Sequence, residues 1–141
     1  MSFVAIRAKI KEKLDAQKGT DKPLVDVFQE NRIGFSGYPS VTFEPSDMSS
    51  DFESNTQNLR KYVFTIYIHQ EIENVSNDAA IGILCGVIDT LVQDFEEDFT
   101  LGGVVSYCSP VPVNWGVYEE AAGKVKYAEI KLECYVSTDI N

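Results

Sequence analysis

The stretch from Arg60 to Gly103 constrains the fold most, because it joins a long strand pattern to an amphipathic helix. Residues 60–70 alternate in two sets that are both fairly apolar, as expected of a central strand covered on two sides. Ser76 or Asn77 can cap the helix that follows, and apolar residues recur at helical spacing as far as Phe95. An acidic run and a turn at Gly102-Gly103 close the stretch. It therefore predicts a helix packed on a sheet.

The flanking segments supply a first helix and the other strands. A stripe of apolar residues at three- and four-residue steps predicts a helix over residues 2–16. Strands are expected at 24–28, 38–44, 104–113 (continuing through 115–118) and 125–136. Alternation in the last one directs five residues inward: Ala128, Ile130, Leu132, Cys134 and Val136. The predicted fold class is α+β, with two helices on a mostly antiparallel five-stranded sheet, in the order α-β-β-β-α-β-β and as one domain over residues 1–141.

Residues 45–57 are the most loop-like part of the chain, since they combine serines and acidic residues with isolated Met48 and Phe52. A long loop within a compact domain usually has a function or is disordered. We therefore expect a flexible arm that becomes ordered against a neighbouring subunit.

Two further features carry expectations about packing. Gly82 and Gly86 lie four residues apart in the predicted helix, where glycine is unfavourable, and indicate either close approach of another backbone or chance. Cys85, Cys108 and Cys134 are an odd number of thiols without metal-binding or redox spacing. They are expected to be buried, reduced thiols.

Composition excludes some classes of partner. The formal net charge of −10 argues against stable nucleic-acid binding, which depends on basic residues that neutralise phosphates. DNA could still pass such a surface without adhering to it. The sequence has neither a signal-peptide pattern nor an apolar run long enough for a bilayer, so no membrane partner is expected.

Catalysis receives little support. His69 is the only histidine, and it lies within a strand pattern, which favours a hydrogen-bonded structural role over a Cys–His pair. No catalytic, cofactor-binding or metal-binding residues are therefore assigned, and no cofactor is expected. The acidic run at the helix end is interpreted as a solvated end, a contact or a lumen lining, with a weak divalent-cation site as the alternative: Asp94, Glu96, Glu97 and Asp98.

The order of elements resembles the tail terminator, or tail completion, proteins of tailed bacteriophages. The resemblance rests on the N-terminal helix, the 38–43 strand, the polar loop before residues 60–68, the helix at 77–95, the segment 99–103 and the closing hairpin at 113–136. It implies a small subunit that forms a ring, expected to be a hexamer, in the tail or neck of a virion assembled in the host cytoplasm. Such a ring caps the tail tube, ends its polymerisation and joins the tail to the head connector.

On that interpretation the chain is not an enzyme. Its partners are itself, the tail tube protein and a head-completion or connector protein, while DNA passes through without specific binding. Complementary charges suggest a candidate interface: Arg7, Lys11, Lys13, Asp47, Asp51, Phe52, Glu53, Glu129, Lys131 and Glu133. The alternatives are a head-completion or stopper protein, a tail tube subunit and a small α+β ligand-binding enzyme.

Overall fold

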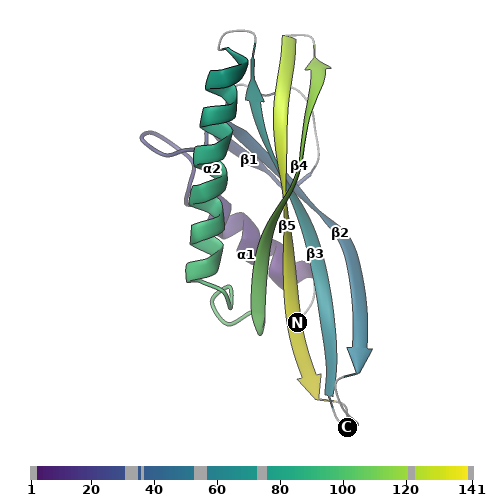
Figure 1. Ribbon diagram of the computed structural model, residues 1–141. Coiled ribbons are helices and arrows are strands. Elements are labelled where there is room, and N and C mark those ends of the chain that lie inside the picture. Colours follow the sequence, from purple (N-terminus) through teal and green to yellow (C-terminus); the bar gives the residue numbers. More distant parts are fainter. Residues whose placement is uncertain are drawn as a thin grey trace.

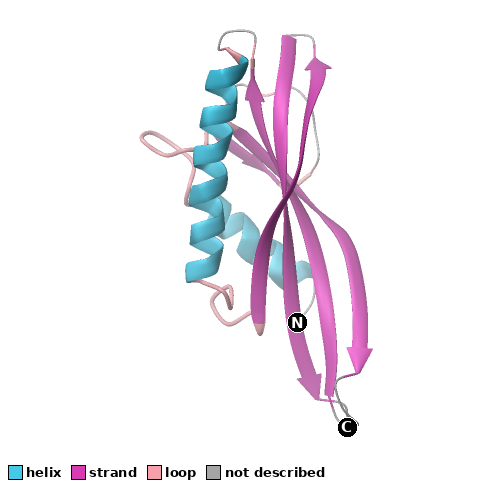
Figure 2. Ribbon diagram, in the orientation of Figure 1, coloured by secondary structure: helices cyan, strands magenta, loops and turns pink. Residues whose placement is uncertain are grey.

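A computed structural model describes residues 3–30, 35, 37–52, 57–72, 76–120 and 123–139. Within these ranges two helices, α1 (Phe3–Asp15) and α2 (Asn77–Glu97), pack on one side of a long twisted sheet (Figures 1 and 2). The strands are β1 (Asp26–Phe28), β2 (Ser40–Phe52), β3 (Gln57–Glu71), β4 (Tyr107–Glu120) and β5 (Gly123–Asp139). The predicted α+β class, strand number and element order are confirmed.

The sheet has the spatial order β1-β2-β3-β5-β4, with β3 at its centre. Only the β1–β2 pair is parallel; the other three pairs are antiparallel. β3 pairs with β5 over its whole length, from Gln57 opposite Asp139 to Glu71 opposite Val125. This continuous pairing makes β3 and β5 the frame on which every other element is placed.

Both helices contribute to a single core on one face of the sheet. Ile6, Ile10 and Leu14 line one stripe of α1, as their spacing predicts. They pack with the inward faces of β3 and β5 and with residues of α2, all in one cluster: Tyr62, Phe64, Ile66, Ile68, Ala128, Ile130, Leu132, Cys134, Val136, Leu84, Val87, Ile88, Leu91 and Phe95. The opposite face of the sheet carries neither helix and is called the helix-free face below.

Helix α2 begins and ends with defined backbone contacts. The Ser76 hydroxyl accepts a hydrogen bond from the Ala79 N–H at 3.1 Å, so the predicted N-cap is Ser76. At the other end, the Asp98 carboxylate accepts the Gly102 N–H at 3.0 Å. Leu101, Gly102 and Gly103 have positive φ values of 49°, 67° and 92°, which the two glycines adopt readily, and they form the tight turn expected there. This turn directs the chain from α2 into β4.

The prediction of a loop over residues 45–57 is wrong over the described part of that segment. β2 continues to Phe52 and β3 starts at Gln57, with Phe52 opposite Asn58; residues 53–56 lie outside the described ranges. The ladder shifts its register between Pro45 and Asp47. Because β1 pairs only with residues 40–42 of β2, Pro45 lies on an open edge, where the missing N–H of proline is tolerated.

The structure also differs from three smaller expectations, on the start of β4, the burial of the cysteines and the packing of two glycines. β4 starts at Tyr107 rather than at residue 104, because residues 101–104 form the turn after α2. Cys108 and Cys134 are buried, but Cys85 is exposed, since it projects beside the buried stripe of α2 rather than within it. Gly82 and Gly86 are exposed, with open space where a side chain would lie, so the sheet is not what approaches them.

Candidate assembly surfaces

Near the β2–β3 hairpin, the helix-free face carries charged side chains from three strands, which we call the charge ladder: Asp47, Lys61, Glu129, Lys131 and Glu133. Lys61 of β3 and Glu133 of β5 form an ion pair at 2.9 Å. Together with Asp47 of β2 and Lys131 of β5 they line a shallow hollow of about 260 Å³. Glu129, the next residue of β5 on this face after Lys131, accepts a hydrogen bond from the Asn114 side chain at 3.2 Å. The structure therefore brings four predicted interface residues onto one face: Asp47, Glu129, Lys131 and Glu133.

One ion pair of the ladder is closed within the subunit. The hydrogen bond from Lys61 to Glu133, and then the charge of that carboxylate, raises the pKa of Lys61. Lys61 and Glu133 are both partly exposed, and ion pairs of this kind add little to the free energy of unfolding. Their value lies in presenting a fixed pattern of charges to whatever contacts this face.

Toward the β4–β5 hairpin, the same face is built around His69, which is only 3% exposed. Its Nε2 lies 2.9 Å from the Thr42 hydroxyl and its Nδ1 lies 2.9 Å from the Tyr118 hydroxyl. The Phe35 ring covers it at a centroid distance of 4.7 Å, and Tyr67 lies at 6.3 Å. Burial lowers the pKa of His69 to about 4, so the imidazole is neutral near pH 7.

The sheet separates His69 from the two buried thiols. Cys108 and Cys134 belong to the core on the helix side, whereas His69 lies on the helix-free face. Burial raises the pKa of both thiols, that of Cys108 to about 11. A neutral histidine with both nitrogens occupied and two protonated thiols across a sheet do not form a nucleophile–base pair.

The ends of β2, β3 and β5 continue past the helices (Figure 1). Register holds these ends together, with Ser49 opposite Lys61 and Lys61 opposite Tyr135. Met48 is 49% exposed although it pairs with the core residue Tyr62. We call residues 48–52, 57–61 and 135–139 the sheet extension. Of the predicted interface residues, Asp51 and Phe52 end β2, their side chains lie outside the described part, and Glu53 is not described.

Several charges of the two helices form ion pairs within the subunit. Lys11 pairs with Asp15 at 2.6 Å. Lys13 pairs with Asp94 at 3.5 Å and with Asp98 at 3.2 Å. The Gly102 N–H and the Lys13 ammonium hold the pKa of Asp98 below its usual value. The basic face of α1 and the acidic run, for which a contact role was one interpretation, thus meet at Lys13 within one subunit.

Arg7, Glu96 and Glu97 are placed differently. Arg7 donates to the Gln29 backbone carbonyl at 2.9 Å instead of to a carboxylate. Glu97 accepts from the Gln93 side chain at 2.9 Å. Glu96 is exposed at the end of α2. Among the predicted charged residues on the helices, Arg7, Glu96 and Glu97 form no ion pair with any described residue.

Some residues of these surfaces were absent from the sequence-based prediction. Lys61 belongs to the charge ladder, and Tyr107 stacks on Tyr135 at 4.5 Å beside it. Tyr118 supplies the hydroxyl that holds His69. Polar and aromatic residues at outward strand positions were the available signal, but only the register shows which of them become neighbours.

The sequence matches no protein-family model and no curated protein sequence. Among the described residues, no three His, Cys, Asp or Glu side chains are grouped so that they could hold a metal ion. None of the described helices has the length and apolarity needed to cross a membrane.

Proposed function

We propose that the chain is a structural subunit of a bacteriophage tail, which forms a six-membered ring that caps the tail tube, ends its polymerisation and connects it to the head. The observation that carries the proposal is the sheet extension, where three long strands run past both helices (Figure 2). Among the described side chains of the extension, Met48, Ser49, Arg60 and Ser137 are exposed, and an exposed strand surface gains stability when another surface covers it. A subunit that packs against its neighbours has a use for such an extension.

The chemistry of the described residues supports an interfacial role. The charge ladder on the helix-free face presents both signs, as Lys61, Lys131, Asp47 and Glu133. Surfaces of mixed sign steer association and fix the orientation of a partner. A net charge of −10 suits a ring through which DNA moves without adhering.

Shortening the β2–β3 hairpin tests this role. Ser49 lies opposite Lys61, so residues 50–60 can be replaced by Asn-Gly, which favours a two-residue turn between antiparallel strands. Because the core residues remain, we expect a folded protein by circular dichroism that no longer assembles into rings. Light scattering after size-exclusion chromatography measures the mass.

The matched control alters the hairpin at the opposite end of the sheet. Glu120 lies opposite Gly123, so Ala121-Ala122 can be replaced by Asn-Gly at the β4–β5 connection. This variant should assemble as the wild type does. Ring formation by the β2–β3 variant would show that the sheet extension is dispensable and would remove the main support for the proposal.

A further inference from the structure

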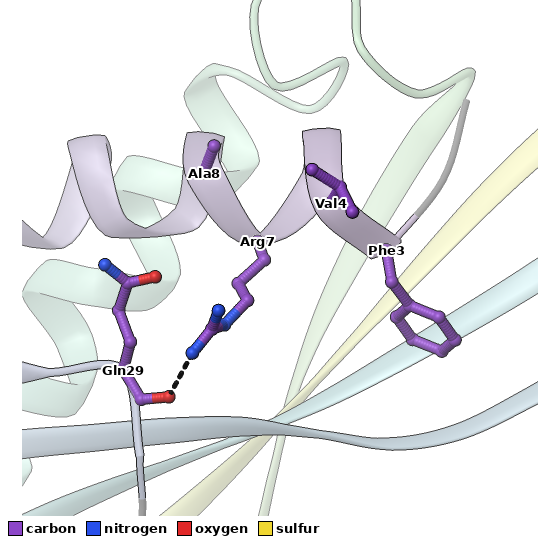
Figure 3. A pocket seen from close by; sticks show the side chains of 5 residues that line it. All are labelled: Phe3, Val4, Arg7, Ala8 and Gln29. Carbon is purple, nitrogen blue, oxygen red and sulfur yellow. Dashed lines mark hydrogen bonds between the residues drawn. The ribbon is translucent and has the colours of Figure 1, made fainter.

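A cleft beside the first turns of α1 is lined by Phe3, Val4, Arg7, Ala8 and Gln29 (Figure 3). We call it the Arg7 cleft. Its volume of about 270 Å³ lies near the lower limit of pockets for small molecules, so it suits one or two side chains of a partner. Val4 is 79% exposed at its rim.

Arg7 supplies an unmatched positive charge to this cleft. The hydrogen bond to the Gln29 carbonyl positions the guanidinium, and it uses only one of the five N–H donors. Lys9, Lys11 and Lys13 on the same helix each pair with a carboxylate, but Arg7 pairs with none that the structure describes. An apolar cleft with a positioned guanidinium that pairs with no described carboxylate fits a carboxylate next to an apolar side chain.

The end of α2 presents that combination. Phe99 is 54% exposed, and Glu96 is exposed three residues before it. Glu96 forms no ion pair within the described residues, unlike Asp94 and Asp98, which contact Lys13. We call Glu96 and Phe99 the α2 knob.

The knob and the cleft of one subunit lie on different sides of α1. The end of the Lys9 side chain lies against Gly102 in the turn after α2, so this side of α1 faces the knob's segment. Residues 7 and 9 point in nearly opposite directions on a helix, since successive residues are about 100° apart. A subunit therefore presents its cleft and its knob to different neighbours.

We propose that the Arg7 cleft of one subunit receives the α2 knob of a second copy, with Arg7 bound to Glu96 and the Phe99 ring against Val4. Such a contact joins two different patches, and repetition of it closes a ring when the rotation between subunits permits. The inference rests on the proposed ring function and specifies one contact of that ring.

Charge reversal tests the contact, with sedimentation velocity as the readout. Arg7→Glu and Glu96→Arg each place like charges together, so each should raise the concentration needed for half-assembly by about a hundredfold. The double variant restores an opposite pair and should assemble near the wild-type concentration. Lys22→Glu and Asp89→Arg, which change exposed charges outside the cleft and knob, serve as matched controls.

Cysteine cross-linking tests the neighbourhood of Phe99 and Val4 directly. Cys85→Ser first removes the exposed thiol. Val4→Cys and Phe99→Cys in the same chain should then give a ladder of disulfide-linked oligomers on oxidation, because each copy supplies one thiol to each of two neighbours. Chains with only one of the two changes should give no such ladder.

The outcomes separate the contact from the function. If the Arg7→Glu variant and the Glu96→Arg variant each assemble at the wild-type concentration, the cleft contact is overturned and the ring proposal still stands. Disruption by Arg7→Glu but not by Glu96→Arg would show that another carboxylate occupies the cleft, which also overturns the contact. A wild-type chain that stays monomeric at millimolar concentration, alone and with tail tubes, would reject both proposals.

Discussion

Leu91→Asp is expected to leave the protein unfolded at room temperature. Leu91 is completely buried in the middle of α2, within the core shared by both helices and the sheet. Truncating a buried leucine costs roughly 2–5 kcal/mol, and burying a carboxyl group without a partner adds several more. Because the whole free energy of unfolding of a domain is about 5–15 kcal/mol, this single change consumes most or all of it.

Thr90→Asp is the matched control for that experiment. It introduces the same side chain one residue earlier on α2, at an exposed position. We expect a change in the free energy of unfolding of about 0.5 kcal/mol or less. Circular dichroism and urea denaturation measure both variants. A cooperative, wild-type-like transition for Leu91→Asp would contradict the assignment of α2 to the core.

Protonation of His69 is expected to lower the free energy of unfolding by about 3 kcal/mol as the pH drops from 7 to 4. The pKa of His69 is about 4 in the folded protein and 6.5 in the unfolded chain. The unfolded state therefore binds a proton first, which favours unfolding throughout this window. Each unit of pKa difference corresponds to about 1.4 kcal/mol, and the loss ends once the folded state is also protonated.

His69→Gln isolates this effect, because the chain has only one histidine. Glutamine can donate and accept hydrogen bonds but does not titrate, so the variant should show little slope between pH 7 and 5. Urea denaturation at several pH values provides the comparison. Equal slopes for the two proteins would show that His69 is not held neutral by its surroundings.

The parts of the fold that pattern alone predicts are those where burial differs between neighbouring residues. β5 alternates cleanly because one face meets the helices and the other does not, and its five predicted inward residues are buried. The stripe of α1 and the cap of α2 follow from equally local rules. These patterns can be recognised in the sequence because each depends on a spacing of only two to four residues.

The end of β2 could not be predicted in the same way. Residues 45–52 form a strand through pairing with β3, yet the side chains of residues 45–49 are exposed and pack in no core. Without a core there is no reason for apolar alternation, so the sequence looks like a loop. Backbone hydrogen bonds to β3 hold this segment as a strand, although its side chains give no strand pattern.

The sequence indicated which charged residues to consider for the candidate surfaces, but it did not predict which of them are neighbours in the fold. Asp47 and Glu133 were chosen for their charge, and the structure brings them to one hollow with Lys61. Lys13 was predicted as an interface residue and Asp98 as part of a solvated end, a contact or a lumen lining, but the two contact each other within the subunit. Pairing between residues 85 positions apart depends on how α1 crosses α2, which no local pattern encodes.

The most direct test of the proposed function is to add the purified chain to the tail tube protein of the same phage, under conditions in which that protein polymerises alone. Electron microscopy then measures tube lengths and shows the tube ends. We predict that growth stops early and that each capped end carries a ring of this chain. Tubes of unchanged length with bare ends would contradict the proposal.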